Sequence, residues 1–317
     1  MVSQIVEEFQ AKKAKSKLNQ VRILVTGSSG FIGSAIFNNL KSDFQVTGLS
    51  RKSEAGLKMD LFKEQIDLSD FEYVIHAAGL AHLKQTDKDA MHQNNVLATR
   101  NLLNGLNPSA LKGFVFCSTV AVYGIQNGVE IEESETPTPN DSYGTSKLQA
   151  EELIAEWCKT HAIPFLILRL PLVVGKNAPG NINRLIDSMR RGRFFLLNGN
   201  ESKRSMVLLG DLVELIRLQI TNGIKSIGIY NITDGTGVGF NDFVLSVCSS
   251  KGFKKPISIP FWLAKLLAVL GSMLGGKLFS LSIIEKMTQT LTFSNQKAQR
   301  DLLFSPSQVL LNLKENI

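Results

Sequence analysis

The sequence is short of the residues that build disulfide frameworks and metal centres. Only three of its 317 residues are cysteines, and none of them forms a CxxC pair: Cys117, Cys158 and Cys248. The four histidines show no HExxH spacing: His76, His82, His92 and His161. This usage favours a reducing, cytoplasmic compartment and predicts no metal site.

No stretch of the chain is apolar for long enough to be a clear membrane span. Such a helix needs about 20 mostly apolar residues, but Lys265 and Lys277 interrupt the most apolar stretch, residues 261–284. We expect an amphipathic helix there, with peripheral contact to the inner membrane face as the weaker alternative. Glu7 and Glu8 interrupt the apolar part of residues 1–20, so these residues are predicted to form an N-terminal extension rather than a signal peptide.

Nucleic-acid signatures and internal repeats are also missing. The formal net charge is +7, with 44% hydrophobic and 20% charged residues, which is typical of a globular protein. Apart from a lysine cluster near the N-terminus, the basic residues are scattered, and no helix-turn-helix, zinc-finger or RNA-binding pattern occurs. The charge therefore favours a small anionic ligand over nucleic acid.

What the chain does have is a regular alternation of β-rich runs and helix-compatible segments. We predict strands at 21–27, 45–50, 71–79, 113–119 and 164–170, and helices at 31–41, 89–106 and 143–161. Strands that alternate with helices in this way form a parallel, doubly wound Rossmann-type α/β sheet.

The alternation loosens after the last of these strands. We therefore assign residues 21–175 to a dinucleotide-binding domain, to which 205–235 returns. Residues 176–204 and 236–317 are predicted to form a smaller substrate-binding module at the carboxyl edge of the sheet.

The first strand runs into a glycine turn, TGSSGFIG, at residues 26–33. Gly27 permits a tight turn, Gly30 lets the backbone approach a pyrophosphate, and Gly33 lets the next helix pack closely on the strand. That helix offers its N-terminal N–H groups to the phosphates. The alternative is a plain βα turn, but the strand before and the helix after it favour dinucleotide binding.

The second strand carries no acid at its end. A site selective for NAD usually has an Asp or Glu there to bind the ribose hydroxyls, whereas this strand ends in Leu49-Ser50-Arg51-Lys52. Arg51 and Lys52 are suited to a 2′-phosphate, which favours NADP over NAD. The alternative is two solvated cations after a strand.

A tyrosine and a lysine stand four residues apart in DSYGTSKL, residues 141–148. On a helix Tyr143 and Lys147 share one face. A nearby ammonium favours the phenolate and lowers the phenol pKa, so the pair is suited to acid–base catalysis. The alternative is a surface tyrosine that packs on a lysine stem.

Taken together, the motifs resemble a known family. TGSSGFIG, HAAG (76–79), NNV (94–96), STVAVYG (118–124), YGTSK (143–147) and LRLP (168–171) occur in this order. The chain resembles the extended short-chain dehydrogenase/reductases, and within them the NAD-dependent epimerase/dehydratase family that acts on nucleotide sugars. The resemblance covers residues 21–305.

The resemblance implies a catalytic triad of Thr119, Tyr143 and Lys147. Tyr143 would take the proton from the 4-hydroxyl of the sugar while the nicotinamide oxidises C4. Lys147 would hold the cofactor ribose and lower the phenol pKa. Thr119 would orient the reacting oxygen.

The resemblance also implies binding residues. Besides the three glycines, Arg51, Tyr143 and Lys147, it assigns to the cofactor Ser29, Phe31, Ile32, Asp60, Leu61, Ala77, Ala78, Gly79, Asn95 and Pro171. It assigns to the substrate His82, Thr119, Asn181 and Arg204. Relatives of this kind are often homodimers, and we expect the same here.

Departures from the family pattern narrow the expected activity. The acidic pair that dehydratases carry after the hydroxyl residue is replaced by Val120 and Ala121, which disfavours dehydration. We predict a UDP-sugar 4-epimerase of the UDP-glucose or UDP-N-acetylglucosamine type in surface polysaccharide synthesis. The alternatives are an NADPH-dependent 4-reductase of UDP-4-keto-6-deoxy sugars and a non-catalytic Rossmann binding protein.

Overall fold

The chain folds into two compact units in the computed structural model, which describes residues 18–52, 56–81, 88–266, 284 and 287–317. Unit 1 comprises Met1–Tyr123, Pro137–Arg169 and Leu212–Tyr230, and unit 2 comprises Gly124–Thr136, Leu170–Asp211 and Asn231–Ile317. Three expectations fall wholly or mostly outside the described residues: the extension at 1–20, most of the helix at 261–284, and a substrate contact by His82.

A seven-stranded sheet forms the centre of unit 1, in the order β12-β7-β5-β4-β1-β2-β3. The strands are β1 (Arg22–Thr26), β2 (Gln45–Ser50), β3 (Gly56–Lys58), β4 (Tyr73–His76), β5 (Gly113–Thr119), β7 (Phe165–Leu170) and β12 (Gly228–Asn231). The pairings of β1 with β2 and β4, of β2 with β3 and of β4 with β5 are parallel. The predicted doubly wound α/β sheet is confirmed.

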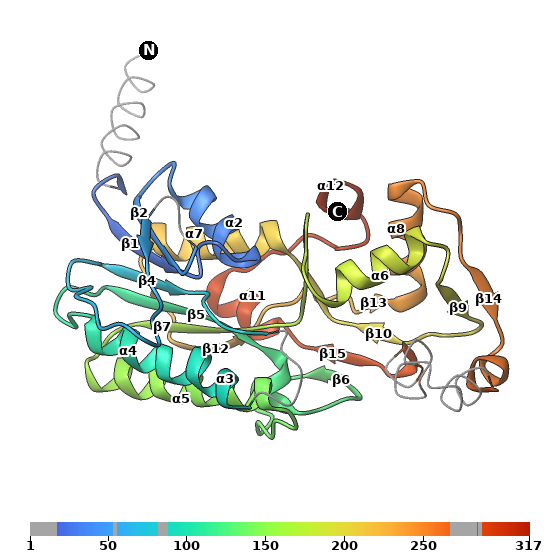
Figure 1. The fold of residues 1–317 in the computed structure, drawn as a ribbon, viewed down its shortest axis with the longest axis horizontal. Helices are drawn as coiled ribbons and strands as arrows, with labels where there is room; N and C mark the ends of the chain where they lie inside the picture. Colours follow the sequence, from blue (N-terminus) through green and yellow to red (C-terminus); the bar gives the residue numbers. More distant parts are fainter. Residues whose placement is uncertain (1–17, 53–55, 82–87, 267–283, 285–286) are drawn as a thin grey trace, which may run out of the picture. The chain divides into compact units, whose positions relative to one another are not determined.

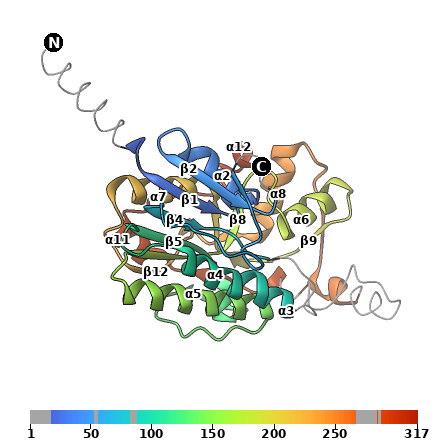
Figure 2. The same cartoon turned by 60° about the vertical axis from the view of Figure 1, so that its left-hand side comes forward.

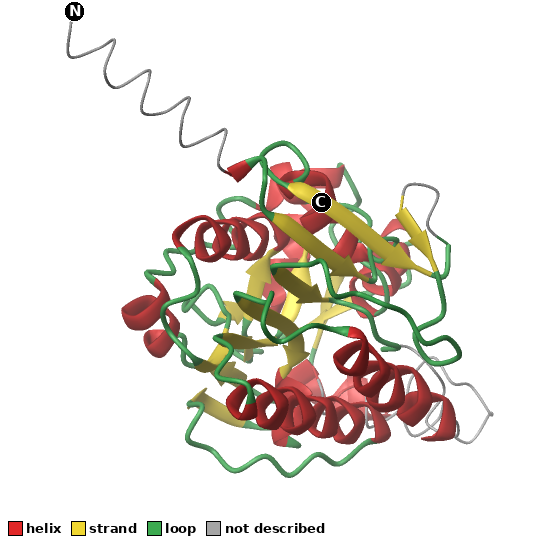
Figure 3. Ribbon diagram, turned by 90° about the vertical axis from the view of Figure 1, so that its left-hand side faces the viewer, coloured by secondary structure: helices red, strands yellow, loops and turns green. Residues whose placement is uncertain are grey.

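Helices cover both faces of this sheet (Figure 1, Figure 2). On one face lie α4 (Ala98–Gly105) and α5 (Ser142–Thr160), and on the other lie α2 (Phe31–Leu40) and α7 (Leu209–Asn222). Figure 3 shows the strands sandwiched between these helices. Strands covered on both faces must be apolar throughout, and β4, β5 and β7 are buried along almost their whole length.

The helix expected over 89–106 is interrupted by a π-helical segment. It divides into α3 (Lys88–Met91), the π-helix η1 (His92–Leu97) and α4. The N–H of Ala98 donates to the carbonyl of Gln93, five residues back. Such single-turn π-bulges are frequent at functional sites, and this one contains Asn95.

The register of the sheet brings the ends of its central strands to one edge. Thr26 of β1 lies opposite His76 of β4, and His76 lies opposite Phe116 of β5. The order of the strands reverses between β1 and β4. Open α/β sheets bind their ligands at the carboxyl ends of the strands beside such a switch point.

Unit 2 is built from short strands and helices. A four-stranded sheet has the order β13-β10-β15-β6, and β11 pairs with β8 and β14 with β9. The strands are β6 (Gly128–Ile131), β8 (Leu172–Val174), β9 (Phe195–Leu197), β10 (Lys203–Arg204), β11 (Met206–Leu208), β13 (Val238–Gly239), β14 (Ile257–Ile259) and β15 (Leu291–Phe293). The helices are α6 (Asn181–Arg190), α8 (Phe240–Lys251), α11 (Gln296–Leu302) and α12 (Leu313–Asn316).

Within the part of the chain that the structure describes, no helix is both long enough and apolar enough to cross a bilayer.

Candidate active site

The glycine turn after β1 is closed by contacts that leave no room for side chains. Gly27 has φ +70°, and a Cβ on it would lie 2.7 Å from the backbone nitrogen of Ala78, in the segment after β4. A Cβ on Gly33 would lie 2.2 Å from the carbonyl oxygen of Gly27. The two glycines therefore let the turn, the first helical turn of α2 and the β4 loop approach one another directly.

The N-terminus of α2, which is the positive end of the helix dipole, is available to an anion. Gly30 is the N-cap residue, so no side chain caps the first N–H groups, and the first turn contains no acid. Uncapped N–H groups and the helix dipole bind phosphate. This turn fits the pyrophosphate of a dinucleotide.

A cavity of about 340 Å³ lies beside the turn. It brings together nine of the residues that the sequence assigned to the cofactor: Gly27, Ser29, Gly30, Arg51, Asp60, Leu61, Ala77, Ala78 and Gly79. Phe31, Ile32 and Gly33 continue into α2 and do not line it. Lys52, which the sequence offered with Arg51 for a 2′-phosphate, also lines the cavity, and the lining residues without an expected role are Leu49, Ser50, Met59, Leu80, Asn94 and Ala98. Their signal was positional, because each lies within two residues of an assigned residue or one helical turn from it.

The end of β2 places a cation at this cavity. The Arg51 guanidinium is exposed and donates to Oδ1 of Asn94 at 3.3 Å. Lys52 is also exposed and lines the same cavity. No acid of β2 occupies the position that the ribose hydroxyls would need. Arg51 and Lys52 thus give the cavity a positively charged rim at the end of β2.

Asn95 joins the loop after β4 to the helix of the YGTSK motif. Its Oδ1 accepts from the N–H of Leu80 at 2.7 Å, and its Nδ2 donates to the Leu80 carbonyl at 3.1 Å and to Oγ of Ser146 at 2.8 Å. A Cβ on Gly79 would lie 3.1 Å from Oδ1 of Asn95 and 3.8 Å from Nζ of Lys147. Asn95 therefore links the loop after β4 to α5 and does not line the cavity.

His76 is a neutral structural residue at the end of β4. Its ring nitrogens contact Oγ1 of Thr26 at 2.6 Å and Oγ1 of Thr99 at 2.9 Å. Thr99 donates its own proton to the Asn95 carbonyl, so Nε2 of His76 must donate to Thr99 and Nδ1 must accept from Thr26. Burial, aided by the Lys147 charge, lowers the His76 pKa to about 3.

Thr119 and Tyr143 meet at the carboxyl end of β5. The Thr119 hydroxyl accepts from the N–H of Ala121 at 3.2 Å, and it hydrogen-bonds the Tyr143 phenol. Gly144 makes this approach possible, since a Cβ there would lie 2.7 Å from the carbonyl oxygen of Ala121. With its oxygen engaged by Ala121, the Thr119 hydroxyl directs its proton at the phenol oxygen.

The Tyr143 pKa is shifted in the direction opposite to the prediction. Burial raises it to about 12 and outweighs the lowering by the Thr119 hydrogen bond. The predicted lowering by Lys147 is therefore wrong for this structure. The Lys147 ammonium is engaged elsewhere: it donates to the carbonyl oxygen of Cys117 at 2.7 Å and lies 4.0 Å from the centre of the Phe116 ring.

Lys147 is itself buried, with 4% of its surface exposed. Burial lowers its pKa to about 8, while Cys117 and Glu151 favour the charged form. The Cys117 carbonyl and the Phe116 face stabilise the ammonium where it lies beside Gly79. Lys147 is thus held at the junction between the β4 loop and the end of β5.

Comparison with known proteins agrees with this architecture. Residues 23–233 match the model of the NAD dependent epimerase/dehydratase family. The chain belongs to this family. It is 27% identical over 277 residues to N-acetyl-alpha-D-glucosaminyl-diphospho-ditrans,octacis-undecaprenol 4-epimerase of Escherichia coli O157:H7, covering 84% of this chain and 80% of that protein. It is also 27% identical to UDP-glucose 4-epimerase of Vibrio cholerae, covering 91% of this chain and 92% of that protein.

Solved structures share the fold of this family member. UDP-glucuronic acid 4-epimerase from Bacillus cereus, in complex with NAD, superposes with a TM-score of 0.73 at 23% identity, covering 93% of this chain and 94% of the other. The predicted membership of the epimerase/dehydratase family is confirmed.

A buried ion pair that the sequence analysis missed lies on the same face of α5. Glu151 follows Lys147 by four residues, and its carboxylate accepts from Nη2 of Arg169 at 2.7 Å and from Nε at 3.2 Å. Ser118 also donates to Glu151, and the Arg169 guanidinium lies 4.6 Å from the Tyr123 ring centre. The four-residue spacing of Tyr143, Lys147 and Glu151 could have shown that Glu151 shares a face of α5 with the other two. It could not have shown that Arg169 of β7 is its partner.

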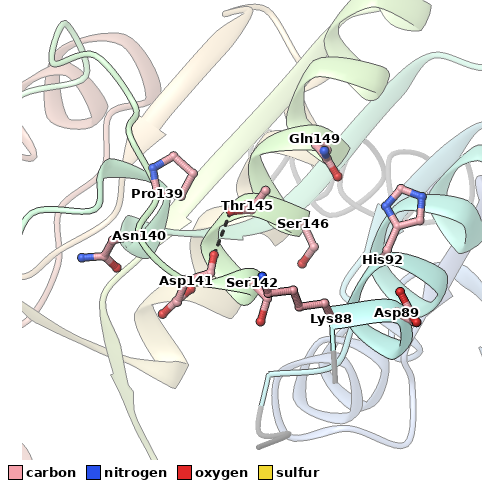
Figure 4. Close-up of a pocket in the computed structure, with 10 residues that line it drawn as sticks. All are labelled: Lys88, Asp89, His92, Pro139, Asn140, Asp141, Ser142, Thr145, Ser146 and Gln149. Carbon is pink, nitrogen blue, oxygen red and sulfur yellow. Dashed lines mark hydrogen bonds between the residues drawn. The ribbon is translucent and has the colours of Figure 1, made fainter. Parts of the chain in front are cut away.

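A second cavity, of about 630 Å³, flanks the N-terminus of α5. Figure 4 shows Lys88, Asp89 and His92 along one wall, and residues of the Pro139–Gln149 segment along the other. Asp141 caps α5 there by accepting from the N–H of Gly144 at 2.7 Å. Charges of both signs line this cavity, so it suits a polar ligand rather than an apolar one.

Three further predicted residues belong to unit 2. Pro171 lies between β7 and β8, and Asn181 is the first residue of α6, after Gly180 with φ +71°. Arg204 lies in β10, opposite Val238 of β13, and is half-buried; burial lowers its pKa. In the described ranges, no group of three or more His, Cys, Asp or Glu side chains is arranged to hold a metal ion.

Proposed function

We propose that the protein is a nicotinamide-dependent 4-epimerase of UDP-sugars, of the UDP-glucose or UDP-N-acetylglucosamine type, in surface polysaccharide synthesis. The observation that carries this proposal is the convergence of Thr119, Tyr143 and Lys147 at the carboxyl end of β5. Lys147 lies there beside Gly79, which lines the cavity at the glycine turn. The two 4-epimerases that match over most of the chain support the same activity.

The residues present fit a dinucleotide. The closed contacts at Gly27 and Gly33 and the uncapped start of α2 would hold the pyrophosphate, and the cavity from Ala77 to Gly79 would hold the rest of the cofactor. When bound, the oxidised nicotinamide supplies the redox chemistry at C4 and a positive charge that favours an ionised phenol.

The side chains have separate roles in this proposal. Tyr143 takes the proton of the 4-hydroxyl as C4 becomes a carbonyl carbon, and returns it when C4 is reduced from the other face. With the substrate bound, Thr119 turns its hydroxyl proton from the phenol to the reacting oxygen and holds that oxygen beside the phenol. Lys147, fixed by the Cys117 carbonyl, binds the cofactor ribose. Because the Tyr143 pKa is about 12, the phenol is protonated at neutral pH until a positive charge is brought next to it.

We further propose a preference for NADP over NAD. Arg51 and Lys52 form a cationic rim at the end of β2, and no acid of that strand competes with it. A guanidinium binds phosphate oxygens with paired hydrogen bonds. A 2′-phosphate at this rim would replace the Asn94 contact of Arg51.

In unit 2, we propose that Arg204 and Asn181 bind the substrate diphosphate. Arg204 is half-buried in β10, and a guanidinium binds diphosphate oxygens with paired hydrogen bonds. Asn181 opens α6, whose first turn contains no acid. The proposal includes a homodimer and a cytoplasmic location, and the latter is supported by three cysteines that are all free and buried.

A second substrate class has specific support. The Escherichia coli relative is named for an undecaprenol-linked diphospho-sugar. Such a substrate carries the same sugar 1-diphosphate group as a UDP-sugar, so the same site chemistry would serve both. Parallel assays with UDP-N-acetylglucosamine and with a polyprenyl-diphosphate-linked N-acetylglucosamine decide between them.

The proposal is tested by incubating the purified protein with UDP-glucose or UDP-N-acetylglucosamine and following both the sugar by NMR and the absorbance of the reduced nicotinamide. An epimerase interconverts the 4-epimers without net change in the reduced cofactor. Net, stoichiometric consumption of NADPH with a 4-keto sugar, and no interconversion of the epimers, would assign the reductase activity instead.

A further inference from the structure

Four large apolar side chains of unit 2 are exposed within one short stretch, residues 257–266. The exposed fractions are 73% for Ile257, 40% for Phe261, 67% for Trp262 and 49% for Leu266. Single exposed apolar residues are ordinary. Several in succession, with a tryptophan among them, are typical of a surface that binds a partner or a membrane.

Buried residues and a strand pairing attach this stretch to the rest of unit 2. Ala264 is fully buried against Leu197, and its N–H donates to the carbonyl of Pro260 at 3.1 Å. Ile259 packs on the same apolar cluster, and β14 pairs in parallel with β9. Because Ala264 points inward, the helical residues 261, 262, 265 and 266 form the outer face.

The charged residues of this segment of the sequence have one sign. No Asp or Glu occurs between Asp242 and Glu285. The described lysines in this interval are all exposed: Lys251, Lys254, Lys255 and Lys265. Nζ of Lys265 lies 4.7 Å from the centre of the Phe261 ring, so on the helical face of residues 261, 262, 265 and 266 a lysine lies directly beside the exposed apolar side chains.

We propose that this lysine–tryptophan surface docks onto the anionic face of a lipid bilayer. It consists of Ile257, Phe261, Trp262 and Leu266 together with Lys254, Lys255 and Lys265. Aromatic and aliphatic side chains next to lysines are the composition of interfacial membrane-binding segments. The lysines are attracted to anionic headgroups while the apolar side chains enter the boundary of the acyl chains.

A second copy of this chain is a poorer occupant. A two-fold interface places the same patch on both subunits, so the lysines of one copy would face those of the other with no carboxylate in the interval to offset them. A bilayer with anionic headgroups supplies the missing negative charge. The inference goes beyond the proposed epimerase activity and does not depend on it, since its test measures binding and not turnover.

The test is cosedimentation of the full chain with vesicles of phosphatidylcholine alone or mixed with phosphatidylglycerol. We expect binding to the mixed vesicles that weakens in high salt.

Trp262→Ser should weaken partitioning roughly tenfold or more, from the lost burial of one large side chain. Lys254→Gln with Lys255→Gln should weaken it roughly thirtyfold. In a Trp157→Phe background Trp262 is the single tryptophan, and its emission should shift to the blue on binding.

The matched control is Leu311→Ser, which removes an apolar side chain that is 78% exposed in another part of unit 2 and should bind as the wild type does. Turnover of a water-soluble UDP-sugar should be unchanged in Trp262→Ser. The proposal is overturned if the wild type does not bind mixed vesicles, or if Trp262→Ser binds equally well. It is also overturned if neither protein binds vesicles and the wild type instead forms a dimer that Trp262→Ser abolishes. That result would mean that the surface binds a second copy of this chain.

Discussion

Glu151 and Arg169 form an ion pair in which both side chains are almost completely buried, with 3% and 2% exposed. The pair joins α5 to β7 below the residues of the proposed catalytic triad. Lys147 and Glu151 are one helical turn apart, so the pair fixes the turn of α5 that carries the Lys147 ammonium. Ser118, next to Thr119, donates to the same carboxylate.

Replacing Glu151 by Gln should therefore be costly. The Arg169 charge would remain buried without its partner, and breaking a buried pair in this way costs about 3–5 kcal/mol of unfolding free energy. The measurement is urea denaturation. The matched control is Glu214→Gln, which breaks the pair of Glu214 with Arg217 on the surface of α7, with 48% and 32% of the side chains exposed, and should cost at most about 1 kcal/mol. Equal losses of unfolding free energy in the two variants would show that burial of the Glu151–Arg169 pair does not increase the cost of breaking it.

A methyl group on Gly33 should destabilise the glycine turn. Its Cβ would lie 2.2 Å from the backbone oxygen of Gly27, and no rotamer change can relieve a contact between backbone and Cβ. Overpacking of this kind costs about 1–3 kcal/mol. Gly210→Ala in α7 is the control, because a Cβ there has nothing within 4 Å. We expect a lower melting temperature for Gly33→Ala only, together with weaker cofactor binding in a fluorescence titration.

The buried His76 should make the protein sensitive to acid. Its pKa falls from 6.5 to about 3 on folding, so between these pH values the unfolded chain binds a proton that the folded protein does not. Stability is therefore lost as the pH falls from about 6.5 to about 3, at up to about 1.4 kcal/mol per pH unit.

His76→Gln should be less stable at neutral pH but should lose stability less steeply with acid, as measured by urea denaturation across this range. His161→Gln, at an exposed position, is the control and should keep the wild-type acid dependence. A wild-type slope in His76→Gln would mean that His76 does not dominate this titration.

Much of the fold was predictable because strand and helix signals are local. The bounds of β2 and β5 agree with the predicted 45–50 and 113–119, since each strand is a short β-rich run with clear ends in the sequence. The π-helical turn at η1 was not predictable, because one extra residue hardly changes the apolar period. Nor was the pairing of Glu151 with Arg169, which depends on contact between a helix and a strand 18 residues apart.

The direction of the Tyr143 pKa shift was mispredicted for a physical reason. The spacing of Tyr143 and Lys147 reports that they share a helix face, but not how deeply the phenol is buried or which acceptor binds the ammonium. In the structure that acceptor is the Cys117 carbonyl, contributed by β5. Burial then decides the sign of the shift.

Charge reversal at Arg51 tests the proposed cofactor preference. The wild type should bind NADPH more tightly than NADH, and Arg51→Glu should reverse this order, because a carboxylate repels a 2′-phosphate and accepts from ribose hydroxyls. The measurement is a fluorescence titration with each reduced cofactor. Lys58→Glu, at an exposed position in β3 outside the cavity lining, is the control. Tighter binding of NADH by the wild type would refute the preference.

The most direct test of the proposed mechanism compares the wild type with Tyr143→Phe, using NMR to follow UDP-glucose or UDP-N-acetylglucosamine from both epimeric directions. We expect the wild type to reach the same equilibrium from either side, and the variant, still folded and still binding the cofactor, to be slower by roughly two to four orders of magnitude. Turnover in Tyr143→Phe equal to that of the wild type would show that this phenol does not move the proton.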